Sequence, residues 1–481
     1  MTISRATTQY GAVTGVLENG YTVFRGIPYA APPVGKRRFS APQPPAPWSG
    51  ERACTQWPPD AYRFPFRDQN MDGVKPTPPH TYAEDCLYLN VWTPAESAGE
   101  KLPVMVWLYG AGGCSHDPYV DGAEICRRGC IMVTFNYRIG VFGFFGLKEF
   151  AEKDEHTSTG TYGIQDILFA LRWVRANIAA FGGDPDCVTV FGHSAGAIYT
   201  KLLLCAVPAW GLFHRVISLS GGGTCDIDYI HSFESKCSLC RELMDRVDWT
   251  VEDLMTRPAQ EICEVLCREE LALELPKKSM LNTLFLPSVD HWLVHDYYGK
   301  LLSDGPVDAS VDVMCGMLSE EWQNVPCQIP GGIQGYEREF ALGPVIAWGR
   351  RYCERGFKPL YNYFFERHMP GGGGKMRHGD ELPYVFGTLE RYDIAWREED
   401  YELSKAILDY FTNFAKTGDP NGPGLARWEA YTTDSQQTMH ISDAGIQSEN
   451  IADYEKATEV VKFLLEHPGM LNDPFSPTIH Q

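Results

Sequence analysis

Val188-Thr-Val-Phe-Gly192-His193-Ser194-Ala195-Gly196 is the stretch that decides the fold, and a helical pattern begins directly after it. The four residues before Gly192 favour a short buried strand. A G-x-S-x-G motif between a strand and a helix is typical of a nucleophile elbow, in which a tight turn exposes the serine oxygen. The flanking glycines avoid collisions with the neighbouring strand and helix. We therefore interpret Ser194 as a candidate nucleophile; the alternative is a serine in an ordinary glycine-rich turn.

Strand and helix patterns alternate on both sides of this motif. Apolar runs predict further strands, and apolar residues at helical spacing predict helices. Asn19-Gly20, between β-forming residues, predicts a two-residue hairpin. Such alternation predicts a largely parallel sheet with helices on its faces, in one domain over residues 1–481 with long insertions. The expected strands are 87–92, 103–109, 131–136, 311–316 and 360–365, and the expected helical regions are 163–181, 224–280 and 400–416.

Composition excludes some partners. The 481 residues include 42 Lys and Arg against 62 Asp and Glu, a net charge of −20. This balance argues against nucleic acid and against anionic membrane surfaces, which both attract clustered basic residues. The most apolar stretch near mid-chain, residues 202–213, is too short to cross a bilayer. The first residues have no apolar core of the secretory type, so we expect a cytoplasmic protein without membrane insertion.

A nucleophilic serine needs a base, and the base needs an acid to orient it. The expected chain order is serine, acid, histidine. His378 follows the expected strand 360–365 in a polar loop, where catalytic residues are often displayed, although a surface histidine is the simpler interpretation. Glu320 and Glu321 both follow the strand 311–316, and the residue pattern alone does not choose between them.

The loop Leu108-Tyr-Gly110-Ala111-Gly112-Gly113 follows another expected strand. Its small residues would let a carbonyl group approach backbone N–H groups, as an oxyanion hole requires. The alternative is a phosphate-binding loop. That alternative is disfavoured because no G-x-x-x-x-G-K-[ST] motif is present.

The chain has 15 cysteines, some in close pairs. Cys237 with Cys240 and Cys263 with Cys267 offer four thiols for a zinc site. Spacings of three and four also place both thiols of a pair on one buried helix face, which we favour. A reduced protein fits this cysteine usage better than a disulfide framework.

Five motifs together resemble the type-B carboxylesterase family, which includes cholinesterases and bile-salt lipases. The resemblance spans nearly the whole chain and implies the α/β-hydrolase fold, a central mostly parallel β-sheet flanked by helices, with long insertions forming a lid or gorge. The motifs are Phe24-Arg-Gly-Ile-Pro-Tyr-Ala30, Glu84-Asp-Cys-Leu-Tyr-Leu-Asn-Val-Trp-Thr-Pro94, Asn136-Tyr-Arg-Ile-Gly-Val-Phe-Gly143, Phe181-Gly-Gly-Asp-Pro-Asp-Cys-Val-Thr-Val-Phe-Gly-His-Ser194-Ala-Gly and Phe414-Ala-Lys-Thr-Gly-Asp-Pro-Asn421.

The same resemblance implies a role for each matching residue. It assigns the triad acid to Glu321, which the residue pattern had left open. The implied set is Ser194 as nucleophile, His378 as general base and acid, Glu321 as the acid, Ala111, Gly112 and Ala195 as oxyanion donors, and Ser220 as a buried support of the triad.

Two departures from the family pattern bear on the site. Relatives usually have three glycines and then an aromatic residue, where this chain has Gly110-Ala111-Gly112-Gly113. A methyl group at Ala111 would crowd the oxyanion site, and the missing aromatic at Gly113 would widen the pocket. Secreted relatives also pair the cysteine of the second motif with one upstream; here Cys54 is the nearest candidate for Cys86.

The expected activity is hydrolysis of carboxylic esters through an acyl-enzyme, with no metal or organic cofactor. Aromatic residues in segment 57–83 favour neutral, apolar or aromatic esters of short to medium acyl chain if they wall the entrance; otherwise they only pin a long loop. One alternative within the enzymes is hydrolysis of amides, lactones or carbamates, which uses the same triad, and another is lipase action on lipid droplets. The alternative outside the enzymes is a non-catalytic binding protein of the same fold. The rings are Trp57, Tyr62, Phe64, Phe66 and Tyr82.

Overall fold

A computed structural model describes most of the chain. The described residues are 2–63, 74–75, 80–222, 232–268, 286–296, 298–320, 337–372, 374, 376–450 and 462. Of the predicted site residues, Glu321 lies outside this part of the chain, as do Phe64 and Phe66.

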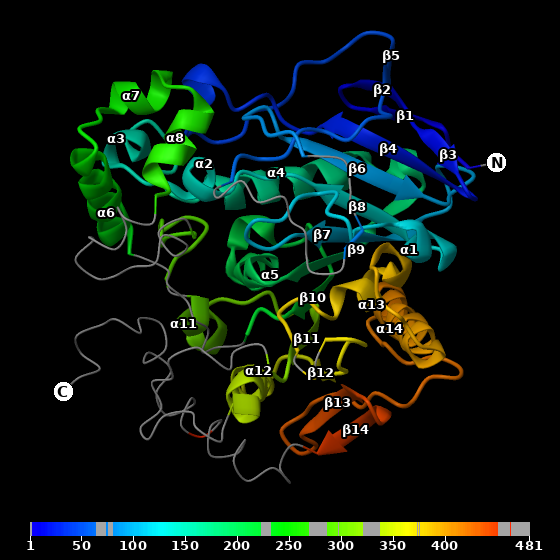
Figure 1. Cartoon of the computed structure of the whole chain (residues 1–481). Helices are drawn as coiled ribbons and strands as arrows, with labels where there is room; N and C mark the ends of the chain where they lie inside the picture. Colours follow the sequence, from blue (N-terminus) through cyan, green and yellow to red (C-terminus); the bar gives the residue numbers. More distant parts are fainter. Residues whose placement is uncertain are drawn as a thin grey trace.

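A large mixed sheet is the centre of the molecule (Figure 1). Its eleven strands run in the order β14-β13-β12-β11-β10-β9-β7-β8-β6-β4-β3, and β1, β2 and β5 form a small separate sheet. The strands are β1 (Arg5–Thr8), β2 (Gly11–Thr14), β3 (Val16–Glu18), β4 (Tyr21–Pro28), β5 (Glu51–Ala53), β6 (Tyr88–Thr93), β7 (Leu102–Leu108), β8 (Ile131–Phe135), β9 (Gly183–His193), β10 (Arg215–Leu219), β11 (Asp312–Leu318), β12 (Tyr361–Glu366), β13 (Gln437–Ser442) and β14 (Gly445–Asn450).

Seven consecutive strands of the sheet, β13-β12-β11-β10-β9-β7-β8, are parallel to one another, whereas β14 and β6 pair antiparallel with the two ends of this set. The register pairs Leu108 with Gly192 and His193 with Leu219. The loops that follow β7, β9 and β10 therefore begin side by side. In sheets of this kind ligands bind outside the carboxyl ends of the strands.

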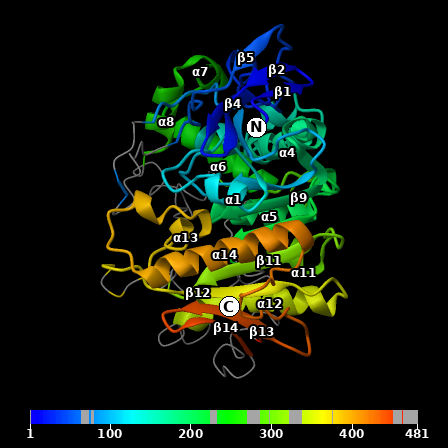
Figure 2. The same ribbon diagram turned by 90° about the vertical axis from the view of Figure 1, so that its right-hand side faces the viewer.

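Helices cover both faces of the sheet. Helices α5, α11 and α12 pack together on one side (Figure 1), whereas α13 and α14 lie in front of the strands in Figure 2. The helices are α1 (Ala123–Arg127), α2 (Gly140–Phe144), α3 (Lys148–Ala151), α4 (Tyr162–Asn177), α5 (Ala195–Cys205), α6 (Phe233–Arg246), α7 (Val251–Thr256), α8 (Ala259–Leu266), α11 (Tyr298–Asp304), α12 (Glu337–Glu354), α13 (Leu382–Phe386) and α14 (Glu398–Thr417), with 3₁₀ turns η1 (Gly35–Arg37), η2 (Ile178–Phe181), η3 (Val207–Ala209) and η4 (Leu389–Arg391).

The predicted α/β-hydrolase architecture is confirmed. The hairpin at Asn19-Gly20 joins β3 to β4, and both turn residues have positive φ, as a tight turn of this kind requires. Each strand predicted from an apolar run is present, within a few residues of its expected bounds. Where the structure describes the region 224–280, it is mostly helical, in α6, α7 and α8 with short connections between them.

The paired cysteines of α6 and α8 are buried core residues, as the amphipathic pattern predicts. Cys240, Cys263 and Cys267 belong to a second hydrophobic core with α2 and α7, and Cys237 is also buried. These four thiols, all described, do not form a metal-ligand group. Cys54 and Cys86 are both buried free thiols.

No helix in the described ranges combines the length and the apolar character needed to span a bilayer.

Candidate active site

Ser194 stands at the sharp turn between β9 and α5. Its φ of 57° and ψ of −124° lie outside the regions that most residues favour. Strain of this kind persists only where the surroundings enforce it. Here Ser194 N–H donates to Leu219 O at 3.0 Å, and Ser194 O accepts a 3.0 Å bond from Ile198 N–H, which starts the helix. The serine is partly exposed, so the turn presents its hydroxyl to the surface above the strand ends.

The glycines of the motif are required by close packing. A Cβ atom at Gly196 would lie 2.1 Å from Leu108 O, and one at Gly192 would lie 2.7 Å from the backbone of Gly196. Both distances are far below van der Waals contact. A larger residue at either position would therefore collide with the neighbouring backbone, as the sequence pattern predicts.

The loop after β7 runs directly beside the serine. A Cβ at Gly110 would lie 2.9 Å from Ser194 Cβ, so the backbone of this loop reaches the nucleophile. Gly112 has a φ of +78°, a left-handed conformation that favours glycine. Ala195 is the first residue of α5, and the first N–H groups of a helix have no acceptor within the helix.

Gly113 and Ala111, the two positions at which this loop differs from the family pattern, have different surroundings. A Cβ at Gly113 would lie 2.9 Å from both Asp117 Oδ2 and Tyr109 Cβ. An aromatic side chain therefore has no space at this position in this chain. Ala111, in contrast, is exposed, and its methyl group is not part of the packed core.

His378 lies in an exposed turn between β12 and α13. Its ring centroid is 4.5 Å from that of His193, the residue before the serine. The structure thus brings the loop of His378 to the elbow, although some 180 residues separate them in sequence.

Glu320 turns toward the loop after β12. Its Oε2 accepts a hydrogen bond from Met376 N–H at 3.3 Å, and its Oε1 lies 3.6 Å from His368 Nε2. These are the contacts that the described residues give the Glu320 carboxylate.

Ser220 begins a buried polar chain beneath the elbow. Its hydroxyl donates to Glu381 Oε1 at 2.9 Å, and the same oxygen lies 3.5 Å from His193 Nε2. Glu381 is 1% exposed, and burial followed by the positive charge of His378 holds the pKa of His193 well below 6.5. His193 is therefore neutral at neutral pH. Nε2 of His193 has no hydrogen-bond partner in the described part of the chain.

Sequence reasoning missed Glu381 and His193. Glu381 follows His378 by three residues and directly precedes the apolar run of α13, a signal that this carboxylate faces the interior. Its neighbour Asp380 has the same character in the sequence, so the pattern did not single out either one. His193 occupies the variable position of the motif, where the pattern places no constraint on the residue type.

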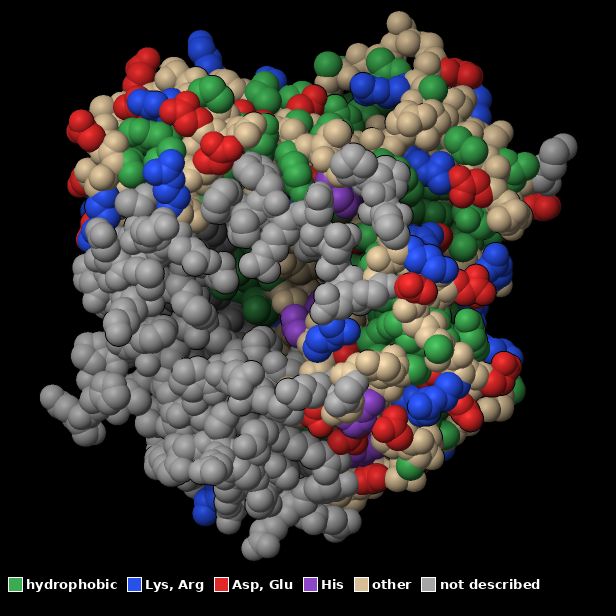
Figure 3. Space-filling view, viewed as in Figure 1, with side chains coloured by type: hydrophobic (Ala, Val, Ile, Leu, Met, Phe, Trp, Pro, Cys, Tyr) green, Lys and Arg blue, Asp and Glu red, His purple; other side chains and the backbone are tan. Residues whose placement is uncertain are grey.

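The described aromatic rings of segment 57–83 pack on neighbouring elements. Trp57 stacks on His116 with ring centroids 5.2 Å apart. Tyr62 contacts both Tyr82 and Phe142, with centroid distances of 6.4 and 6.1 Å. These three rings pin the segment to the molecule. The face of the molecule drawn in Figure 3 is hollowed near its centre, and hydrophobic and histidine side chains are visible within the hollow.

One group of possible metal ligands is present among the described residues: Asp60, His80, Cys114 and His116 have ligand atoms that all lie within 4.8 Å of one another.

Known proteins resemble this chain along almost its full length. The model of the Carboxylesterase family matches residues 4–339 and 340–459. The para-nitrobenzyl esterase of Bacillus subtilis (strain 168) is 31% identical over 498 residues, covering 95% of this chain and 98% of that protein. Carboxylesterase 1C of Mus musculus is 31% identical over 527 residues, covering 96% and 92%. A solved thermophilic PNB esterase has a TM-score of 0.82 at 28% identity, covering 95% of this chain and 99% of the other.

Proposed function

Because the chain belongs to the carboxylesterase family and is a carboxylic ester hydrolase, we propose that it cleaves small esters through an acyl-enzyme on Ser194. The observation that carries this proposal is the conformation of Ser194 at the end of β9, with the glycine loop packed against it. A strained, partly exposed serine at the carboxyl ends of parallel strands is typical of a nucleophile elbow.

His378 acts as the base and then as the acid. It takes the proton of Ser194 as the hydroxyl attacks the ester carbonyl, and gives it to the leaving alcohol. The turn that carries His378 lies against His193, directly beside the nucleophile. Because His193 stays neutral, it adds no positive charge that would oppose protonation of His378.

Glu321 orients the imidazole and stabilises its positive charge. The neighbouring Glu320 is engaged by Met376 N–H and His368, which supports the choice of Glu321. Ser220 and Glu381 form a buried support beside His193, the residue before the nucleophile.

The backbone N–H groups of Ala111, Gly112 and Ala195 hold the oxyanion of the tetrahedral intermediate. The approach of Gly110 to Ser194 and the position of Ala195 at the start of α5 support this role. Water then attacks the acyl group and releases the acid.

The substrates are neutral, apolar or aromatic esters with short to medium acyl chains. The hydrophobic side chains in the hollow of Figure 3 support uncharged substrates, and the net charge of −20 favours neutral or cationic substrates over anionic ones. Amides, lactones and carbamates remain chemically open to the same residues.

The chain works as one catalytic domain, residues 1–481, in the cytoplasm. The sheet draws strands from Val16 to Asn450, so the described halves share one sheet. The described cysteines, Cys54 and Cys86 among them, are free thiols, as in a reducing compartment.

The test is the release of nitrophenol from C2 to C8 nitrophenyl esters by wild type, Glu321→Gln and Glu320→Gln. We expect Glu321→Gln to lower kcat by on the order of 10⁴, the loss known for removing the charge of a triad acid. Glu320→Gln, one residue away, is the matched control and should retain most activity. Inactive wild type would contradict the ester hydrolysis, and a greater loss in Glu320→Gln would contradict the assignment of the acid.

A further inference from the structure

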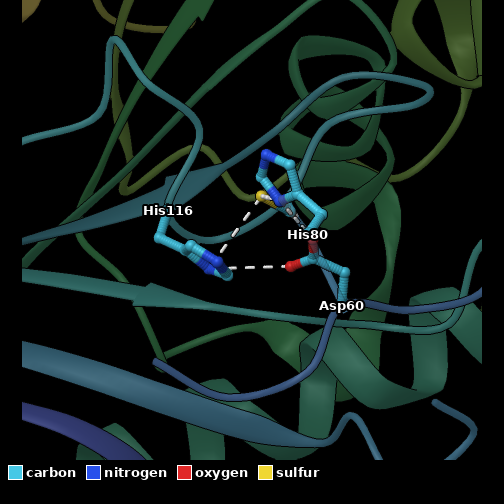
Figure 4. Close-up of side chains that lie close together, drawn as sticks. Asp60, His80 and His116 are labelled. Atoms are coloured by element: carbon cyan, nitrogen blue, oxygen red, sulfur yellow. Dashed lines mark hydrogen bonds and ion pairs between the residues drawn. The ribbon is translucent and has the colours of Figure 1, made fainter. Parts of the chain in front are cut away.

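Four side chains with metal-binding atoms meet beside the segment that follows the glycine loop after β7. Asp60 and His80 come from the irregular segment before β6, and Cys114 and His116 follow the glycine loop. The labelled side chains point toward one another in Figure 4. Asp60 and Cys114 are buried, whereas the His80 and His116 side chains are 8% and 15% exposed.

The separations of these atoms approach those of a tetrahedral site. Cys114 Sγ lies 3.8 Å from His80 Nδ1 and 3.9 Å from His116 Nδ1. Asp60 Oδ1 lies 3.6 Å from His116 Nδ1, and Asp60 Oδ2 lies 2.6 Å from His80 Nδ1. Zinc bonds of about 2.0–2.3 Å in tetrahedral geometry place ligand atoms about 3.3–3.6 Å apart. Because all four ligand atoms already lie within 4.8 Å of one another, small side-chain adjustments would bring them onto one ion.

The hydrogen bonds within this cluster leave one buried carboxylate oxygen without a hydrogen-bond partner among the described residues. Asp60 is 2% exposed, and its Oδ1 atom has no hydrogen-bond partner among the described residues. A buried polar atom without a partner is costly, and a bound cation would satisfy it. A divalent ion with one thiolate, one carboxylate and two neutral imidazoles also gives a site of zero net charge.

The backbone holds the two halves of the cluster in place. Asp60 N–H donates to Thr81 O at 2.8 Å, and Ala83 N–H donates to Asp60 O at 3.0 Å, which fixes Asp60 beside the chain at His80. On the other side, Cys114 N–H donates to Asp117 Oδ2 at 2.8 Å and Ser115 N–H donates to Asn136 Oδ1 at 2.9 Å. Ligands held in this way need little rearrangement to bind an ion.

We propose that Asp60, His80, Cys114 and His116 bind one divalent transition-metal ion, and that Zn²⁺ is the best match. Imidazole and thiolate ligands select zinc over magnesium or calcium. Four protein ligands leave no open position for a water molecule, so the site is structural. The ion ties the segment of Asp60 and His80 to the loop after β7 and takes no part in ester cleavage.

Co²⁺ is the probe, because a thiolate bound to Co²⁺ absorbs in the near ultraviolet and a tetrahedral ion absorbs strongly in the visible. Chelator-treated, reduced protein is titrated with Co²⁺ as wild type, Cys114→Ser, His116→Ala and Cys86→Ser. Cys86 is the matched control, since its thiol is as buried as that of Cys114 but lies outside the cluster. The Ser194→Ala protein is titrated as well, so that metal binding is measured independently of hydrolysis.

We expect one Co²⁺ per chain in wild type, Cys86→Ser and Ser194→Ala, displaced by Zn²⁺, with the thiolate band absent in Cys114→Ser. His116→Ala, which keeps the thiol, should bind Co²⁺ at least about 10-fold more weakly. Zn²⁺ should raise the Tm of wild type but not of Cys114→Ser. Circular dichroism checks that each variant is folded; if Cys114→Ser is not, His116→Ala decides. Absence of the thiolate band in wild type, or its full retention in Cys114→Ser or in His116→Ala, would overturn the proposal.

Discussion

At the scale of single residues, the elbow sits on a buried polar chain that the motif alone does not reveal. His193 occupies the variable position of the motif, and its ring lies between the loop of His378 and the carboxylate of Glu381. A neutral imidazole here can accept or donate a hydrogen bond without adding charge below the active serine. The identity of this residue therefore affects stability in a way that depends on pH.

We predict that His193 makes the protein less stable in mild acid. In the folded state burial, and then the charge of His378, hold the pKa of His193 well below 6.5, whereas the unfolded chain takes up this proton near 6.5. The unfolded state thus binds more protons as the pH falls below 6.5, and stability falls by up to about 1.4 kcal/mol per pH unit. Above pH 6.5 His193 is neutral in both the folded and the unfolded state, so it does not change the free energy of unfolding.

Urea unfolding of wild type and His193→Gln between pH 7.5 and 5 measures this effect. The free energy of unfolding should fall more steeply in wild type than in the variant, because glutamine does not titrate. Parallel pH profiles for the two proteins would show that His193 does not have the depressed pKa.

At the scale of elements, the packing of α4 against the end of β8 depends on a buried ion pair. Arg138 Nη2 and Nε donate to Asp166 Oδ1 and Oδ2 at 2.7 and 2.8 Å. The two side chains are 3% and 0% exposed. Arg138 N–H also donates to the carboxylate of Asp166 at 3.0 Å. The Asp166 side chain on α4 therefore neutralises the guanidinium and also holds the backbone of the loop after β8.

We predict that Asp166→Asn lowers the free energy of unfolding by about 3–5 kcal/mol, because it leaves a buried guanidinium without its counter-charge. Asp186→Asn is the control. Asp186, on β9, pairs with Arg175 of α4, but these side chains are 70% and 43% exposed, and such exposed pairs add little to stability. Chemical denaturation compares the two variants, and equal losses would contradict the importance given to burial.

At the scale of the whole molecule, the sheet was predictable where its strands are continuous apolar runs, as in β7, β8 and β9. Buried parallel strands have this pattern because both faces are covered. The hairpin of β13 and β14 at the sheet edge was not predicted, since His440 and Glu449 interrupt its apolar pattern. Ser194 and the loop at Gly110 were predictable because close packing restricts both to a few residue types.

Contacts between distant segments were not predictable from local patterns. Glu381 joins Ser220, and Asp60 joins Cys114, only because the folded chain brings separate loops together. Spacing along the sequence holds no information on such pairs. For the same reason the choice between Glu320 and Glu321 came from the family resemblance and not from the residue pattern.

The most direct test of the central claim is covalent labelling with a fluorophosphonate, which reacts with an activated serine, followed by mass spectrometry of intact and digested protein. We expect one label per chain on Ser194 in wild type and none in Ser194→Ala, whose ester turnover should fall by on the order of 10⁴–10⁶. A label on another serine, or a Ser194→Ala variant that still turns over esters, would contradict the account.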